Sequence, residues 1–552
     1  MAEPAVVGDV IESPPRSRRP LAAVLTAVAV VVVVLLGGGA FALARMWNGP
    51  VGTLPEDLVP GSVAAFARID LAPGIGQRVK VEALLRKAGG GSKSFDDTKR
   101  DIFADLGAPI RYDDVASWFD DRAGVALWAD PDRDGKAVTL AVLSSRDDKK
   151  ARTALDAAQR RAGTDSIGFV AGDGSVLLAF GGKDLQRVAT AAAAAAKKAP
   201  LSKEPAFTSA VAKLPAGQPG LAWADLARAT VLQQAVVATA LEEEDLGDEA
   251  GPIPLPDVKG TLVVGVQAAD DGIEIRARVS GAAGLPLTGA ATGTDALAQL
   301  GALAADATAA GVAAGPLGDL TVLGGSEFLL TSSLFPLVFL GGAVTPGDVE
   351  LDAPPPGFDP DTAIELPPDV DPTDPESLHK YLEEHPEVLA GGTVRRILPP
   401  GAATAGTEAL RKGSEALTKA LTGAASVSFT VAGPAGPDDA PGGPLLIDLR
   451  LADAATAKQL QTDLAGLLKA GGTVCEVREE HVILRTKTYA AGKGTLADSP
   501  RFKAATTGGV PGATAAFYLD GERGDAAPAK AVGVTVGRDG TDTVVMARIL
   551  IG

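Results

Sequence analysis

The feature that most restricts the fold of this chain is an apolar run near its start. Residues Leu21 to Ala44 contain no charged side chain. As an α-helix this run would measure about 36 Å, which is enough to cross a hydrocarbon core of about 30 Å with some tilt. The sequence therefore predicts one transmembrane helix over residues 21–44.

Basic residues on the two sides of this run predict its orientation. Arg16, Arg18 and Arg19 precede the run, whereas only Arg45 directly follows it. The positive-inside rule then makes residues 1–20 a cytoplasmic tail and places the remainder of the chain outside the cytoplasm. A cleaved signal peptide is the alternative, because the run ends in Ala-Leu-Ala, although it exceeds the usual apolar core of about 7–15 residues.

Composition excludes several classes of function for the outer region. The 552 residues are 46% apolar and 22% charged, which is typical of folded protein. The net charge of −18 gives no general attraction to nucleic acid. The single cysteine, Cys475, excludes an internal disulfide, a cysteine-cluster zinc site and a cysteine-ligated iron–sulfur cluster.

Beyond the membrane run, strand-like and helix-like segments alternate. Alternating apolar residues predict strands, and acidic first turns with basic last turns predict helices. The hairpin signal Ala-Gly-Asp-Gly lies between two of the strands. The expected strands are 62–71, 124–129, 137–143, 169–170, 175–180, 221–226, 259–268 and 273–280, and the expected helices are 147–161, 183–198, 207–214 and 227–241.

The same order of segments returns in the second part of the chain, which indicates an internal duplication. A strand at 445–451 precedes a helix at 453–469, a hairpin at 474–477 and 482–486, and final strands at 531–537 and 542–550. The phrase SPRF ending at Phe502 resembles EPAF ending at Phe207, and FYLD ending at Asp520 resembles WAD ending at Asp225. Each pair is separated by the same distance along the chain.

We therefore expect two duplicated halves, residues 52–282 and 283–552, preceded by the transmembrane helix. Each half combines hairpins with helices, so the predicted class is α+β with antiparallel sheet and packed helices. The second half contains an insertion at about 344–376 that is rich in proline, aspartate and glutamate. We interpret this insertion as a flexible surface segment.

The sharpest local motif is the sequence Asp-Pro-Asp-Arg-Asp-Gly at 130–135. The alternate carboxylates of Asp130, Asp132 and Asp134, followed by glycine, match the start of an EF-hand calcium loop. However, Ala141 occupies the position of the bidentate glutamate, and the flanking segments are strand-like. A hairpin turn is therefore the other interpretation of this motif. These three residues are the candidate metal ligands, and calcium is the one candidate cofactor.

The remaining candidates for chemistry are weak. His379 and His385 do not share a helix face, and His481 lies beside two glutamates in the turn of an expected hairpin. The sequence contains no metalloprotease motif, nucleophile elbow, P-loop or dinucleotide fingerprint. The acidic residues Asp369, Asp371, Asp374 and Glu376, and the run 242–245, are expected to be solvated.

The start of the outer region resembles a bacterial family. The phrase VPGSVAAFARIDLAP at 59–73 and the phrase GQRV at 76–79 are similar to the opening of a domain of unknown function, family number 3352 of that series. The regions around Phe207 and 221–225 also resemble it. The N-terminal arginines, the single apolar run and the Ala/Gly richness resemble members from high-GC actinobacteria. The resemblance implies no catalytic residue, cofactor or substrate.

Together these observations predict a cell-membrane protein with one span, a cytoplasmic N-terminus and an extracytoplasmic bulk. Its expected function is that of a non-enzymatic binding or structural module of the cell envelope. The expected partners are the membrane, through residues 21–44, and an envelope protein or wall polymer, but not nucleic acid. Two alternatives remain open: a calcium-responsive binding module through the loop at 130–134, and an envelope hydrolase that uses paired carboxylates.

Overall fold

The computed structural model describes two compact units of the chain. One unit contains the described residues up to Ala302 together with Ala497–Gly552, and the other contains those from Leu303 to Leu496. The apolar run, the insertion at 344–376 and the acidic run 242–245 lie outside the described residues. In the part that is described, no helix is long and apolar enough to cross a membrane. The described residues are 54–70, 110–131, 136–163, 166–181, 183–232, 259–283, 295–314, 423–432, 444–471, 473–523 and 529–552, with single residues at 77, 79, 80, 84, 100, 416 and 420.

The first unit is built on an antiparallel sheet. Its strands lie in the order β14-β15-β16-β8-β7-β6-β1-β2-β3-β5-β4. Short hairpin turns join β2 to β3, β4 to β5, β7 to β8 and β15 to β16. The strands are β1 (Ala65–Asp70), β2 (Phe119–Ala129), β3 (Ala137–Ser145), β4 (Gly168–Gly172), β5 (Ser175–Phe180), β6 (Gly220–Asp225), β7 (Lys259–Ala268), β8 (Gly272–Ala283), β14 (Ala515–Asp520), β15 (Ala529–Asp539) and β16 (Asp542–Ile551).

The second unit repeats part of this arrangement. Its strands lie in the order β12-β13-β11-β10-β9, and each neighbouring pair is antiparallel. This is the same pattern as β4-β5-β3-β2-β1 in the first unit. The strands are β9 (Ala307–Ala314), β10 (Ser426–Ala432), β11 (Leu445–Arg450), β12 (Thr473–Arg478) and β13 (His481–Thr486).

Helices pack against both sheets, and side-chain caps define where several of them begin. The Asp147 carboxylate accepts a hydrogen bond from the Lys150 N–H at 3.0 Å, and Asp453 accepts one from the Thr456 N–H at 2.8 Å. These bonds start two equivalent helices, α6 and α16. The helices and short 3-10 turns are η2 (Pro55–Asp57), α5 (Tyr112–Val115), α6 (Asp148–Ala162), α7 (Leu185–Lys198), η4 (Leu201–Lys203), α8 (Pro205–Val211), α10 (Ala296–Gly301), α16 (Ala454–Gly471), η8 (Leu496–Asp498) and α17 (Pro500–Thr506).

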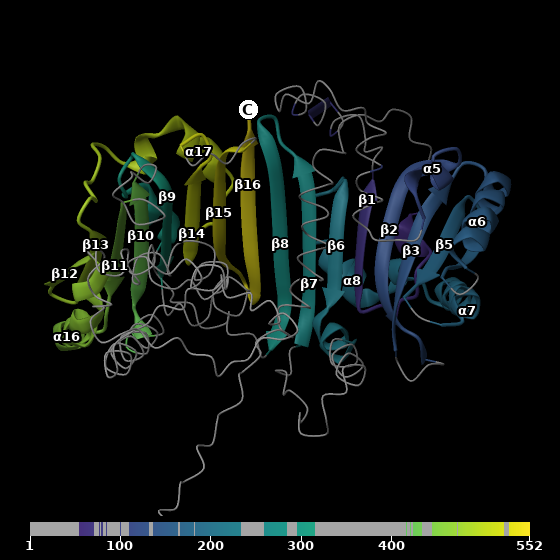
Figure 1. The fold of residues 1–552 in the computed structure, drawn as a ribbon, viewed down its shortest axis with the longest axis horizontal. Coiled ribbons are helices and arrows are strands. Elements are labelled where there is room, and N and C mark those ends of the chain that lie inside the picture. The colour runs from purple at the N-terminus through teal and green to yellow at the C-terminus, as the bar shows by residue number, and fades with distance from the viewer. Residues whose placement is uncertain are drawn as a thin grey trace, which may run out of the picture. The chain divides into compact units, whose positions relative to one another are not determined.

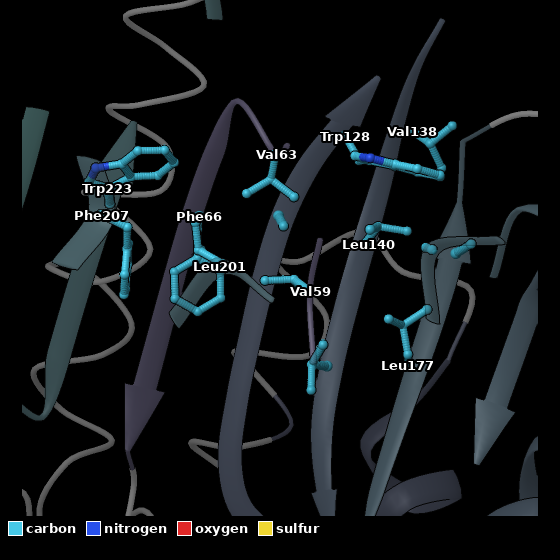
Figure 2. Packing of buried hydrophobic residues seen from close by; sticks show 14 of the residues in the cluster. Val59, Val63, Phe66, Trp128, Val138, Leu140, Leu177, Leu201, Phe207 and Trp223 are labelled. Carbon is cyan, nitrogen blue, oxygen red and sulfur yellow. The ribbon is translucent and has the colours of Figure 1, made fainter. Parts of the chain in front are cut away.

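The sheet of the first unit buries apolar side chains on both of its faces near β3 and β5. Leu140 and Leu177 belong to a cluster with α7 and α8, whereas Leu143 and Leu178 belong to a cluster with α5 and α6. Successive residues of a strand point to opposite faces, so a strand covered on both sides becomes apolar throughout. Figure 1 shows α6 and α7 beside β5, and Figure 2 shows the cluster on the α7 side.

Strands β8 and β16 lie side by side in the first unit and form a reciprocal pair (Figure 1). Thr543 faces Val279, and Ile549 faces Ile273. Counted from the hairpin turn that precedes each strand, Ile273 of β8 is equivalent to Thr543 of β16, and Val279 of β8 is equivalent to Ile549 of β16. The start of each strand therefore pairs with the later part of the other strand, as in an interface with two-fold symmetry.

Ion pairs repeat this reciprocity across the seam, by which we mean the paired strands β8 and β16. Arg278 of β8 reaches Asp539 at 2.7 Å and Asp542 at 3.0 Å, beside the β15–β16 turn. Arg548 of β16, at the equivalent position, reaches Asp271 of the β7–β8 turn at 2.5 Å and Glu274 of β8 at 3.0 Å. Each of the two strands thus supplies one arginine that is bonded to acidic residues at or beside the hairpin turn of the other strand.

The α+β class with antiparallel sheet is confirmed, and so are the expected strands and helices that fall on described residues. One local expectation needs correction. His481 was expected in a turn, but it is the first residue of β13 and pairs with Arg478 of β12. The turn is closed by Glu479 and Glu480 alone, with Glu479 at the positive φ of 55°.

Candidate functional site

The structure places one of the three candidate calcium ligands. Asp130 follows β2, and its fully buried carboxylate accepts a hydrogen bond from Arg187 of α7 at 2.7 Å. Its N–H bonds the Lys136 carbonyl at 3.2 Å, which closes a hairpin turn. Asp132 and Asp134 lie outside the described residues. Among the residues that are described, no group of three or more His, Cys, Asp or Glu side chains could hold a metal ion. The calcium site stays a prediction.

A group of polar side chains gathers on one face of the sheet in the second unit. We call this group the open face. It is formed by alternate residues of three neighbouring strands, so their side chains point the same way. The intervening residues of the same strands, Ile447, Leu449, Val482 and Leu484, are buried, and α16 packs against β12 and β13. The open face consists of Asp448 of β11, Glu476 and Arg478 of β12, and His481, Ile483 and Arg485 of β13.

Hydrogen bonds connect these side chains in two groups. His481 Nδ1 lies 2.8 Å from Asp448 Oδ1. Glu476 accepts bonds from Arg485 Nη2 at 2.9 Å and from Arg478 Nη2 at 2.9 Å. The bonds from Arg485 and Arg478 lower the pKa of the Glu476 carboxyl below its usual value. The charges are therefore held in fixed positions while the side chains stay partly exposed, from 31% for Asp448 to 71% for Arg478.

The open face differs in composition from the equivalent surface of the first unit. At the equivalent positions of β3 and β5 it has Val142, Leu177 and Ala179, which are buried beneath α7. In the first unit, α7 lies between β5 and η4, whereas only residues 487–495 lie between β13 and η8. The described residues of the second unit thus present a polar, partly exposed surface where the first unit has an apolar surface covered by α7.

The open face presents charged groups in fixed positions. His481 bonds Asp448, and among the described residues no serine, threonine or cysteine hydrogen bonds to it. These fixed donors and acceptors can pair with a polar ligand.

Sequence reasoning missed the open face because its members come together only through strand pairing. Asp448 and His481 are separated by a helix and a strand along the chain. One signal was present in the sequence. Positions that are apolar in the first half, such as Val142 and Ala179, are charged in the second, where they are Asp448 and Arg485. A comparison of the halves strand by strand would have revealed it.

Cys475 lies on the other face of β12, where burial and then the neighbouring Glu476 raise the pKa of its thiol to about 11. Because the thiolate is the reactive form, we expect maleimide labelling of the native protein at pH 7 to be at least about a hundredfold slower than after denaturation. The rates are followed by mass spectrometry of the intact chain. Equal rates in the two states would contradict this prediction.

Comparisons with known proteins identify no relative, because no family model, no curated protein and no solved structure matches this chain.

Proposed function

We propose that this protein is a single-pass membrane protein whose extracytoplasmic part is a non-enzymatic binding or structural module of the cell envelope. Residues 21–44 would be its anchor, and Arg16, Arg18 and Arg19 would keep its N-terminus in the cytoplasm. The resemblance to family number 3352 belongs to the same proposal. It agrees with an anchored protein but supplies no substrate or cofactor.

The outer region, in this proposal, consists of two duplicated halves at 52–282 and 283–552. The recurrent strand order supports this division, and so does the reciprocal pairing of β8 with β16. A local detail supports it too. Asp225 ends β6 and bonds the N–H of Arg228 at 3.0 Å, and Asp520 ends β14 and bonds the N–H of Arg523 at 3.2 Å.

The open face is the single observation that favours binding. It exposes a carboxylate–imidazole pair and an arginine–glutamate group where the other half has a covered apolar surface. Charged side chains are costly in a dry core but not where water reaches them. Charged residues at these positions therefore agree with an exposed binding surface rather than a covered core. A polar partner, such as an envelope protein or wall polymer, is the class of ligand that such a surface matches.

Membrane topology tests the first part of the proposal. We expect that protease added to intact spheroplasts removes a C-terminal tag of the full chain and leaves an N-terminal tag untouched. Lysis should expose both tags to the protease. Protection of the C-terminal tag in intact spheroplasts would refute the proposed localisation, and loss of residues 1–44 from the mature chain would show a cleaved signal peptide instead.

The binding role is tested with two substitutions in the open face, Asp448→Ala and Arg485→Ala. We expect the detergent-solubilised variants to lose the envelope components that purify with the wild type. The free energy of unfolding should fall by no more than about 1 kcal/mol, because exposed ion pairs contribute little. Lys149→Ala, on the exposed face of α6, is the matched control and should retain those components. Equal retention in all variants, or reproducible turnover of a wall polymer, would refute the proposal.

The effect of calcium on thermal stability distinguishes the proposed function from the alternative of a calcium-responsive binding module. Arg187 already neutralises the buried carboxylate of Asp130. We therefore expect the melting temperature to be the same in millimolar calcium and in chelator, as measured by scanning calorimetry, because an ion that does not bind the folded state cannot stabilise it. A calcium-dependent rise that disappears in Asp132→Ala would establish the alternative.

A further inference from the structure

The outer edge of β12 differs from the equivalent edge of the first unit. A two-residue turn joins β12 to β13, and Arg478 pairs with His481 beside it. Successive residues of a strand direct their backbone N–H and C=O groups alternately toward and away from the neighbouring strand. Because Arg478 bonds His481, the N–H and C=O groups of Cys475 and Val477 point away from β13. The bond from Gln461 Nε2 to the Cys475 carbonyl, at 3.1 Å, agrees with that direction. These backbone groups therefore lie on the sheet's edge.

In the first unit, side chains close the corresponding edge of β4. The Phe169 N–H donates to Gln186 Oε1 at 3.1 Å, and its carbonyl accepts from Gln186 Nε2 at 2.9 Å. The Ile167 carbonyl accepts from Gln159 of α6 at 2.8 Å, and the Ala171 carbonyl accepts from Arg152. Because these backbone groups of β4 already have hydrogen-bond partners, they are not available to pair with a further strand.

The edge of β12 has only one such bond in the described part of the chain. Gln461 satisfies the Cys475 carbonyl, and the described residues 487–495, between β13 and η8, form no helix that could supply a counterpart of Gln186. The Cys475 N–H, the Val477 N–H and the Val477 C=O have no hydrogen-bond partner among the described residues. Unpaired edge groups of this kind are a template for a further strand.

We propose that β12 pairs with β12 of a second copy of this chain, antiparallel and centred on Val477. In this register the two Val477 residues exchange N–H and C=O bonds, which satisfies both unpaired groups of Val477. The Cys475 N–H then lies beside the β12–β13 turn of the second copy. This inference goes beyond the proposed function and does not depend on it.

The charges of Glu476 and Arg478 favour the register centred on Val477 over the registers shifted by one or two residues. Centred on Val477, Glu476 of each copy stands directly opposite Arg478 of the other, so two pairs of opposite charge form. A register centred on Glu476 would place the two carboxylates opposite each other, and one centred on Cys475 would leave each carboxylate opposite Val474. Arg478 is 71% exposed and can therefore reach a neighbouring strand without disturbing the core.

Hydrogen exchange of the full chain in detergent tests the proposal directly. We expect the amide of Val477 to exchange at least about tenfold more slowly as protein concentration rises through the dimerisation range. The Phe169 amide, already bonded to Gln186, is the internal control and should exchange at one rate throughout. Sedimentation measured on the same samples should show a monomer passing to a dimer.

Two substitutions break the proposed pairing without breaking the fold. Val477→Pro removes an N–H that faces away from β13, a position where an edge strand tolerates proline. Arg478→Glu sets like charges opposite each other, and Arg478→Lys is its matched control. We expect the first two variants to be monomeric with unchanged exchange at Phe169, and the lysine variant to dimerise. A dimer that persists in Val477→Pro, or exchange at Val477 that ignores concentration, would overturn the proposal.

Discussion

Replacement of Trp223 by alanine is expected to lower the free energy of unfolding by about 3–5 kcal/mol. Trp223 lies in β6 with 2% of its surface exposed. Its ring meets that of Phe207 edge to face at 5.7 Å, and Phe207 meets Phe66 at 6.0 Å (Figure 2). Loss of the indole would leave a cavity at the point where β6, β1 and α8 pack together.

The matched control is Trp223→Phe. The indole Nε1 is buried and has no hydrogen-bond partner in the described chain, so phenylalanine removes an unsatisfied donor while it keeps an aromatic ring. We expect this variant to lose clearly less stability than Trp223→Ala, because the phenyl ring leaves a smaller cavity. Urea denaturation followed by tryptophan-independent circular dichroism measures both. Equal losses in the two variants would contradict the packing argument.

The second large effect is expected at the seam. Arg278→Ala should cost about 3 kcal/mol, because it leaves the buried carboxylate of Asp542 with less compensation. Asp542 would keep its bond to Lys213 at 2.6 Å but lose that to Arg278. Arg548→Ala should cost a similar amount, because Glu274, whose side chain is only 13% exposed, would keep its bond from Gln267 at 2.8 Å but lose that from Arg548.

Arg160→Ala, on the exposed surface of α6, is the control for the seam and should change stability by less than about 0.5 kcal/mol. Arg278 and Arg548 have no partner in common. The double variant should therefore lose about the sum of the single losses. Chemical denaturation measures all four proteins. A loss at Arg278 no larger than that at Arg160 would show that the seam ion pairs are unimportant.

Acid should weaken the seam through Asp542. Burial raises the pKa of this carboxyl, but hydrogen bonds from Lys213, Arg278 and Ser280 outweigh burial and hold it below its ordinary value of 3.8. Its contribution to stability is thus complete above the unfolded pKa and is lost as the pH falls through the lower folded pKa. Denaturation at several pH values should show this loss reduced in Arg278→Ala.

Local patterns in the sequence were sufficient to predict most of the described elements. Alternation predicted β1, and acidic residues in the first turn indicated the start of α6, because these signals depend on near neighbours alone. Helices were found at both members of the echo between Phe207 and Phe502, α8 and α17. The position of His481 was wrong by one residue, since only the strand pairing shows that two residues suffice for the turn.

The candidate site could not be predicted in the same way. The motif at 130–135 made Asp130 a candidate metal ligand. Its bond to Arg187, by contrast, depends on the placement of α7, which no local pattern shows. Asp448, Glu476 and Arg485 belong to no motif. Their proximity results from the register of β11, β12 and β13, which distant parts of the chain decide.

The sequence by itself determined the α+β class, the hairpins and the capped helices, since hydrophobic period, turn chemistry and capping act between residues close in the chain. It also determined that the described part has no cysteine pair and must be held by packing. The tertiary structure alone decided three things: the reciprocal seam of β8 and β16, the open face, and the unpaired edge of β12. Each depends on strand register, and register is set by contacts between segments far apart in sequence.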